Sequence, residues 1–176
     1  MIAVGALSPL TGYMNQADYQ SVVHTMHLAN GLAWSIPVTL AVDERLAENL
    51  NIGQSAVLTE KVDGETRLLA ILDISDKFAY DPQVEAQSVY RTTDTAHPGV
   101  ARLYKQGSVL LGGDVHVINL PQRVNEEFPD IRFTPSETRA IFSERDWRRV
   151  VGFQTRNPIH RAHEYIQKTA LEIVDG

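Results

Sequence analysis

The sequence predicts an α+β fold in two parts: a β-rich domain over residues 1–133, then the beginning of a doubly wound α/β domain over residues 134–176. Three observations support this division. Short strand-like apolar runs and short helical stretches alternate through the first part. A strong helix start follows the turn around Pro129. After that helix come an apolar run, a loop and a second helix, which is the order in which a doubly wound sheet begins.

Composition limits the class of protein. The 176 residues are 43% hydrophobic, which is enough to bury a core, and they carry a net charge of −6. No apolar run approaches the roughly 18 residues that a membrane span needs, and the first residues lack the charged region of a signal peptide. The sequence has no cysteine and therefore offers neither a disulfide nor a thiolate metal site. We expect a cytoplasmic protein that does not enter a membrane.

The first predicted helix runs from Asn15 to about Leu28 and is ended by Gly31. Asn15 is a good N-cap because its side-chain oxygen can accept a backbone N–H of the first turn. A glycine suits the end because it tolerates the left-handed conformation found there. The apolar residues that share one helical face are Tyr19, Val22, Val23 and Met26.

Four strands and three short helical stretches are predicted downstream. The strands cover residues 36–42, 56–60, 66–74 and 109–119, and the helical stretches cover 43–50, 82–90 and 98–105. The sequence VDGE at 62–65 predicts a hairpin, because Asp-Gly suits the positive φ angles of a tight turn. These features favour antiparallel strands with small helices between them.

The second part begins at a capping box. Thr134, followed by Pro135 and by Glu137, is a strong helix start. The sequence WRRVVGF at 147–153 then predicts a strand that is buried on both faces. A loop follows, and Asn157 before Pro158 predicts the cap and first residue of a helix over residues 158–174.

This loop carries an unusual local charge. Residues 145–163 contain five arginines and one acid, a local net charge of +4, so the rest of the chain carries about −10. The first N–H groups of the predicted helix, together with its dipole, favour an anion, and Arg156 can grip tetrahedral oxygens. A solvated charged helix end is the alternative interpretation of the arginines.

Three interpretations of His160 and His163 remain open. At a spacing of three residues the two imidazoles share a helical face. They could form local hydrogen bonds only, they could bind a metal ion, or they could contact phosphate. A zinc site is disfavoured, because the protease motif has an i, i+4 spacing with an intervening Glu. Phosphate contacts are favoured by the predicted helix start and by Arg156.

Residues 154–163 contain no Asp or Glu. A kinase or hydrolase usually needs a base that deprotonates an alcohol or a water molecule. An attacking group that is already an anion needs none, and the site then has only to align and neutralise two anions. The loop is therefore compatible with nucleotidyl transfer between anions, although its residues do not identify the acceptor.

The sequence VVGFQTRNPIHRAHEYIQ at 150–167 closely resembles the signature of the ATP sulfurylase family. The stretches GALSPLTGYM, WSIPVTL and TDTAHPGVARLY resemble the PUA-like N-terminal domain of that family, so the resemblance covers essentially the whole chain. It implies a PUA-like domain over residues 1–133, followed by the start of a Rossmann-like nucleotide-binding catalytic domain over residues 134–176.

The resemblance also implies an activity, in which sulfate joins the α-phosphate of ATP and pyrophosphate leaves. It implies sulfate contacts from Gln154 and Arg156, and ATP contacts from Gln154, Thr155, Arg156 and Asn157. Thr155, Arg156 and Asn157 would form the catalytic loop, and His160 and His163 would stabilise the transition state. Mg²⁺ would arrive with ATP, with no metal held by the protein itself.

The resemblance implies partners as well: ATP, sulfate, the remainder of the catalytic domain and, at full length, further copies of the chain. Because family members continue past Gly176, we expect a fragment with little or no activity of its own. The alternatives are an RNA-binding PUA-like module and a structural module without catalysis. The acidic composition disfavours nucleic acid.

Overall fold

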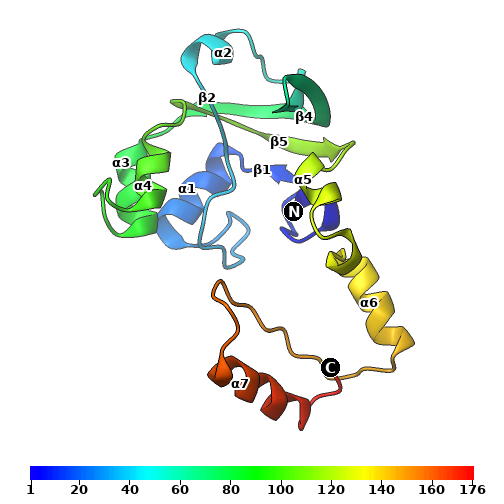
Figure 1. Ribbon diagram of the computed structural model, residues 1–176. Coiled ribbons are helices and arrows are strands. Elements are labelled where there is room, and N and C mark those ends of the chain that lie inside the picture. Colours follow the sequence, from blue (N-terminus) through cyan, green and yellow to red (C-terminus); the bar gives the residue numbers. More distant parts are fainter. The chain divides into compact units, whose positions relative to one another are not determined.

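The computed structural model describes residues 1–176, with the side chains of all but Asn125, Glu126 and Pro129. The chain divides into two compact units, residues 1–127 and residues 128–176. The first runs from blue to yellow-green in Figure 1 and contains the sheet, and the second contains the helices α6 and α7.

An antiparallel sheet organises the first unit. Within the described residues it has five strands, in the order β1-β5-β4-β3, and β2 pairs with the same edge of β5 as β1. The strands are β1 (Gly12–Tyr13), β2 (Leu40–Val42), β3 (Ser55–Val62), β4 (Glu65–Ala79) and β5 (Val109–Val117). The prediction of a mixed α+β fold with antiparallel strands is confirmed. β2 covers only the end of the predicted strand 36–42, because the carbonyl of Val38 instead accepts a hydrogen bond from Met14 N at 3.0 Å.

The hairpin between β3 and β4 forms where the Asp-Gly pair predicts it. Val62 and Glu65 are the last paired residues of the two strands. Asp63 and Gly64 between them have φ angles of 52° and 87°. Two successive positive φ angles define the turn whose twist matches a two-residue hairpin.

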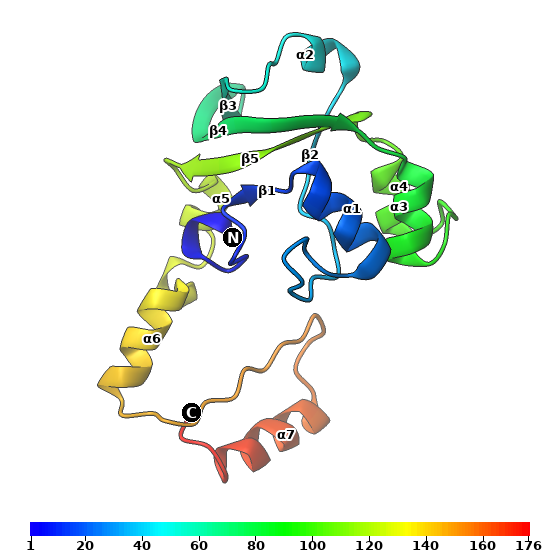
Figure 2. The same ribbon diagram turned by 180° about the vertical axis from the view of Figure 1, so that it is seen from behind.

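Short helices surround the sheet. In the first unit they are η1 (Ile2–Val4), α1 (Gln16–Thr25), α2 (Glu44–Glu48), α3 (Pro82–Glu85), the π-helical η2 (Ala86–Tyr90), α4 (Pro98–Leu103) and α5 (Gln122–Glu126). Figures 1 and 2 show α2 on the opposite side of the β4–β5 ribbon from α1, α3 and α4. The helical stretch predicted at 82–90 is therefore present over its full length, as α3 followed by η2, and those predicted at 43–50 and 98–105 are present with shorter bounds.

The helix α1 confirms its predicted start and corrects its predicted end. Asn15 caps it by accepting a hydrogen bond from Asp18 N at 2.8 Å. The helix ends at Thr25, since Met26 adopts the left-handed conformation with φ 57°, and Gly31 lies beyond it. Met26 is consequently 49% exposed, whereas the other predicted face residues are buried. The carbonyl of Met26 accepts Trp34 N at 2.8 Å, which closes the loop that replaces the last predicted turn.

Two apolar clusters lie on the two sides of the sheet. One joins α1 to the strands through Met14, Tyr19, Val22, Phe78 and Leu110, all of them buried. The other is centred on Leu72, Ile74 and Leu111, against which the partly buried side chains of β2 and β3 pack. Burial of such side chains contributes about 1.5–3 kcal/mol each to folding. The sheet therefore has a core of its own within residues 1–127.

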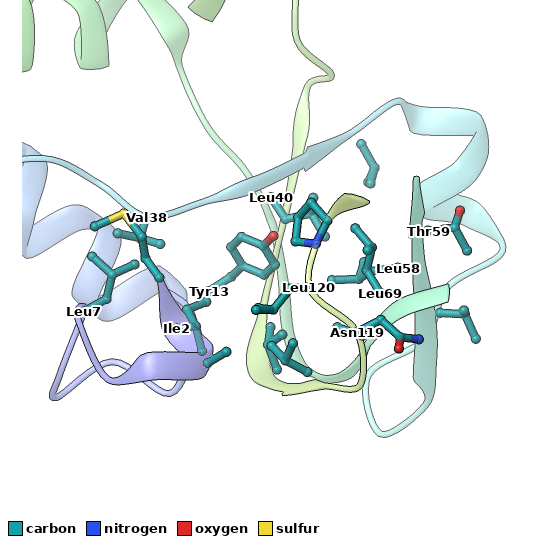
Figure 3. Close-up of a pocket in the computed structure, with 18 of the residues that line it drawn as sticks. Ile2, Leu7, Tyr13, Val38, Leu40, Leu58, Thr59, Leu69, Asn119 and Leu120 are labelled. Carbon is teal, nitrogen blue, oxygen red and sulfur yellow. The ribbon is translucent and has the colours of Figure 1, made fainter. Parts of the chain in front are cut away.

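Apolar side chains also line an open cavity of about 620 Å³ in the first unit (Figure 3). Its wall combines the start of the chain with the strands and with the segment after β5. The labelled lining residues include Tyr13, Leu40, Leu58, Leu69, Asn119 and Leu120. Few polar groups face it, so it is poorly suited to hold two anions.

A buried polar pair lies beside the first cluster. The hydroxyl of Tyr19 donates a hydrogen bond to Glu85 Oε2 at 2.8 Å, and Glu85 is only 6% exposed. Burial raises the pKa of the Glu85 carboxyl, and the hydrogen bond from Tyr19 opposes that rise in part. Burial, followed by the nearby Glu85 charge, also raises the pKa of Tyr19. The pair is thus a hydrogen-bonded link between α1 and α3.

The second unit contains η3 (Pro129–Ile131), α6 (Pro135–Glu144) and α7 (Arg161–Leu171). The predicted capping box of α6 is confirmed. Thr134 Oγ1 accepts from Glu137 N at 3.3 Å, and Glu137 Oε2 accepts from Thr134 N at 2.7 Å. The bond from Thr134 N, followed by one that Thr134 Oγ1 donates to the same Oε2 at 2.7 Å, lowers the pKa of the Glu137 carboxyl, since both favour its charged form.

The strand predicted over WRRVVGF is wrong for this structure. Residues 147–153 are irregular, and Val150, Val151 and Phe153 are 38%, 48% and 40% exposed. A parallel strand is stable only inside a sheet whose other strands pair with it, and the described residues supply no such sheet here. The coarser prediction, a helical C-terminal stretch after an antiparallel domain, is confirmed.

No helix among the described residues is both long and apolar enough to cross a bilayer.

We predict that Glu85→Gln makes the stability of the first unit less dependent on pH. A carboxyl with a raised pKa binds its proton more tightly in the folded chain. Its contribution to the free energy of unfolding is therefore greatest at low pH. That contribution falls as pH rises from about 4.5 through the raised pKa. Glutamine keeps the acceptor for Tyr19 but cannot ionise. The difference in unfolding free energy between pH 5 and pH 8, measured in urea, should change by on the order of 1 kcal/mol.

The matched control is Glu48→Gln, which alters an exposed carboxyl on α2. Glu48→Gln should leave the pH dependence as in the parent chain. Equal effects of the two substitutions would contradict the assignment of this pH dependence to Glu85.

Candidate functional site

The segment that leads into the basic loop is tied to the end of the chain. Asp175 Oδ2 accepts hydrogen bonds from the backbone N–H groups of Arg148 and Arg149 at 2.9 and 2.8 Å. Asp175 N in turn donates to Arg149 O at 2.8 Å, and Val151 N donates to Gly176 O at 3.0 Å. The backbone hydrogen bonds, led by that of Arg149, lower the pKa of the Asp175 carboxyl. This pairing ties residues 148–151 to the last residues of the chain although they form no strand.

The loop itself contains a tight turn. Thr155 Oγ1 accepts Asn157 N at 3.1 Å and donates to Asn157 O at 3.3 Å. Thr155 is half-buried, while Gln154 and Arg156 on either side of it are exposed. The turn therefore presents the Arg156 guanidinium and the Gln154 amide to solvent, where anionic ligands could reach them.

The predicted helix start at Asn157 and Pro158 is wrong. The helix α7 begins at Arg161, and its N-cap is His160 with φ −128° and ψ 173°. His160 Nδ1 accepts the hydrogen bond of Ala162 N at 3.3 Å. Asn157 instead belongs to the turn with Thr155, whose Oγ1 accepts the Asn157 N–H and donates to the Asn157 carbonyl oxygen. The free backbone N–H groups predicted just after Pro158 are consequently not found there. The N-terminus of the helix lies at the two histidines instead.

The two histidines lie against one another. The ring centroids of His160 and His163 are 3.8 Å apart, and the planes of the rings differ by 30°. The ring of Phe153 meets His163 edge-on, with centroids 5.5 Å apart. His163 Nδ1 is buried and has no hydrogen-bond partner among the described residues. The expectation that the two imidazoles share one face is confirmed, and Phe153 joins them.

The loop and the start of α7 carry no acidic residue of their own. Residues 154–163 contain no Asp or Glu, and the next acid, Glu164, accepts from Lys168 Nζ at 2.6 Å. Among the described side chains, no three or more His, Asp or Glu residues are grouped so that they could hold a metal ion. The arrangement is a set of hydrogen-bond donors and positive charge near the start of a helix, which suits anions.

The structure thus brings together two pairs of the predicted site residues: Thr155 with Asn157, and His160 with His163. For Gln154 and Arg156 the structure shows that both residues are exposed to solvent. Sequence reasoning missed Phe153 and Asp175. Phe153 ends an apolar run that predicts a strand, and nothing in that sequence pattern indicates a ring contact with His163. Asp175 pairs with backbone groups more than twenty residues away, and only the folded chain reveals that contact.

Other motifs of the sequence have structural roles. His97 is the N-cap of α4, accepting Gly99 N at 3.2 Å, and its ring lies 5.0 Å from that of Tyr90. His116 pairs with Asp73 at 3.0 Å, and both side chains are more than half exposed. The hydrogen bond from Ser55, followed by that with His116, lowers the pKa of the Asp73 carboxyl.

Comparison with known proteins agrees with the two-part organisation. The family model described as a PUA-like domain matches residues 1–120, and the one described as ATP-sulfurylase matches residues 129–175. Proteins named sulfate adenylyltransferase from Synechococcus sp. (strain JA-3-3Ab) and Symbiobacterium thermophilum are 57% and 56% identical over all 176 residues. The chain covers 44% and 43% of their lengths, so it spans less than half of these relatives.

A solved structure gives a similar result. The hexameric APS kinase from Thiobacillus denitrificans superposes with a TM-score of 0.69 at 33% sequence identity. The match covers 98% of this chain and 29% of that protein.

We predict that Asp175→Ala loosens the segment that leads into the loop. The substitution removes the acceptor of two backbone N–H groups, so the amides of Arg148 and Arg149 should exchange with D₂O several-fold faster at neutral pH. Because the pKa of Asp175 is lowered, the tether is present above its usual pKa and is lost as pH falls through the lowered value. Glu172→Ala, an exposed carboxylate on the same segment, is the control. Equal exchange in both variants would rule out the tether.

Proposed function

This chain belongs to the ATP sulfurylase family, of which it contains the PUA-like domain and the start of the catalytic domain, and we propose that the full-length protein is a sulfate adenylyltransferase. The observation that carries the proposal is the loop at 154–163, which combines Arg156, two amide side chains and two stacked histidines without a single carboxylate. The identity of 57% to a sulfate adenylyltransferase over the whole chain supports it.

The proposed reaction needs no base from this loop. A sulfate oxygen attacks the α-phosphorus of ATP in line, and the bond to the β-phosphate oxygen breaks. Pyrophosphate leaves with that electron pair, and adenosine 5'-phosphosulfate forms. Sulfate is fully ionised at neutral pH, so no proton has to be removed. The site has to hold two anions close together and to offset the charge of the transition state.

The side chains of the loop would contact both substrates. Gln154 and Arg156 would bind sulfate, because a guanidinium and an amide both donate to tetrahedral oxygens. Gln154, Thr155, Arg156 and Asn157 would also contact the phosphates of ATP. His160 and His163 would donate to the phosphates where negative charge accumulates.

Mg²⁺ belongs to the substrate in this proposal. The loop offers amide, hydroxyl, guanidinium and imidazole groups, whereas Mg²⁺ prefers carboxylate and phosphate oxygens. The phosphates of ATP therefore suit the ion better than this part of the protein. Bound with ATP, Mg²⁺ would neutralise phosphate charge.

Further parts of the fold follow from the same proposal. Residues 147–153 would become the first strand of a Rossmann-like sheet when the remainder of the catalytic domain pairs with them. We also propose a cytoplasmic enzyme, since ATP is its substrate, and a homo-oligomer at full length. The hexameric structure of the similar APS kinase supports the last point.

The activity is tested in the full-length protein by sulfate-dependent exchange of labelled pyrophosphate into ATP. We expect exchange by the full-length protein and little or none by the 176-residue chain. Arg156→Ala should lower kcat/KM by about 10²-fold or more, the scale of losing one charge-stabilising donor. Arg156→Lys should recover little of it, since lysine lacks the planar fork of donors.

Arg139→Ala is the matched control, because Arg139 is exposed on α6, outside the loop. It should leave exchange unchanged. Unchanged turnover in Arg156→Ala would remove the loop from the catalytic mechanism.

A further inference from the structure

We propose that the two histidines have different roles: His160 presents an uncharged N–H donor to the bound phosphates, His163 is the imidazole that can take up a proton there, and Phe153 positions it. The inference rests on the proposed function, which places phosphates at this loop. Three observations carry it: the cap formed by His160, the unpartnered nitrogen of His163, and the ring contacts that join them to Phe153.

The cap decides the tautomer of His160. Its Nδ1 accepts the backbone N–H of Ala162 at 3.3 Å, and a nitrogen that accepts a hydrogen bond carries no proton. The neutral ring must then carry its proton on Nε2. A second proton would occupy Nδ1 and break the cap. While α7 keeps its first turn, His160 is therefore a neutral donor through Nε2.

No hydrogen bond to Nδ1 fixes the tautomer of His163. It is the third residue of α7, and its Nδ1 is buried without a hydrogen-bond partner among the described residues. Buried polar atoms without a partner are uncommon in folded proteins. Because Nδ1 is enclosed, His163 would meet a bound phosphate through its other ring nitrogen, Nε2. Protonation of His163 breaks no hydrogen bond that the structure contains.

The stacking of the two rings favours a charge on only one of them. With ring centroids 3.8 Å apart, two charged imidazoles would repel each other strongly, so one charged and one neutral ring is the favoured combination. The nearest carboxylate along α7, on Glu164, is engaged by Lys168 at 2.6 Å. Charge at His163 thus finds its counterion in the bound anion.

Phe153 holds His163 from another side. The two rings meet edge to face, with centroids 5.5 Å apart and planes 64° apart. Such contacts fix the orientation of a ring more than a purely aliphatic neighbour does. Phe153 touches no substrate in this proposal, so it is a positioning residue. It lies directly before Gln154 and therefore couples the loop to the start of α7.

The first test is a spectroscopic one and needs no activity. In the 176-residue chain with ¹⁵N-labelled imidazoles, we expect His160 to show an unprotonated Nδ1 and a protonated Nε2 at neutral pH. Phe153→Leu should shift the His163 signals, and Phe153→Tyr should leave them close to those of the parent chain. Tyr165→Leu, which removes an exposed ring from α7, is the control. A proton on His160 Nδ1, or equal shifts in Phe153→Leu and Tyr165→Leu, would overturn the proposal.

The second test uses pyrophosphate exchange by the full-length protein. Phe153→Leu should lower kcat about tenfold with KM for ATP changed less than about twofold, as expected for a misplaced catalytic group. Phe153→Tyr should recover most of the loss. His160→Asn keeps a good N-cap but removes the imidazole. It should keep the helical content of α7 and still lose about tenfold in kcat.

These outcomes separate the inference from the proposed function. Parent kcat in His160→Asn would mean that capping is the whole role of His160, and would overturn the inference. Absence of sulfate-dependent exchange in the unaltered full-length protein would instead refute the proposed function. The tautomers of the two rings would still be decided by the ¹⁵N spectra.

Discussion

The hydrogen bond from Ala162 N to the imidazole of His160 fixes the start of α7 and with it the arrangement of the two histidines. It sets the residue at which α7 begins, and it thereby places His163 in the first turn of the helix. The stacked rings and the contact with Phe153 follow from that placement. A serine or asparagine would cap the helix equally well. Neither would bring a second imidazole face to within 3.8 Å of the first.

The features that the sequence predicts well are those determined within a few residues. The Asp-Gly turn, the Asn15 cap and the Thr134 capping box each involve neighbours at most three positions apart, and all three form as predicted. The start of α7 was predicted wrongly because two local signals compete. Asn157 followed by Pro158 has the chemistry of a helix start, yet Thr155 Oγ1 draws both the N–H and the carbonyl of Asn157 into a turn. The imidazole of His160 caps the helix instead.

The predicted strand at 147–153 failed for a different reason, namely that a strand depends on partners far away in the sequence. Its apolar residues are present and Asp175 ties it to the last residues of the chain, but pairing requires a sheet. The exposed side chains of Val151, Phe153 and Ile166 are consistent with a unit whose packing partners lie elsewhere in the longer relatives, of which this chain spans 44%. Residues 1–127, by contrast, bury their own core.

Charge explains why such a site can work in an acidic chain. The local excess of +4 over residues 145–163 contrasts with about −10 elsewhere, and no carboxylate interrupts the loop. A carboxylate there would pair with Arg156 and would repel both proposed substrates. A neutral donor at His160 adds a hydrogen bond without adding to the repulsion between cations at the loop. A reaction between two anions thus needs both kinds of group: fixed charge that gathers the reactants, and uncharged donors that hold them without crowding positive charge around the helix start.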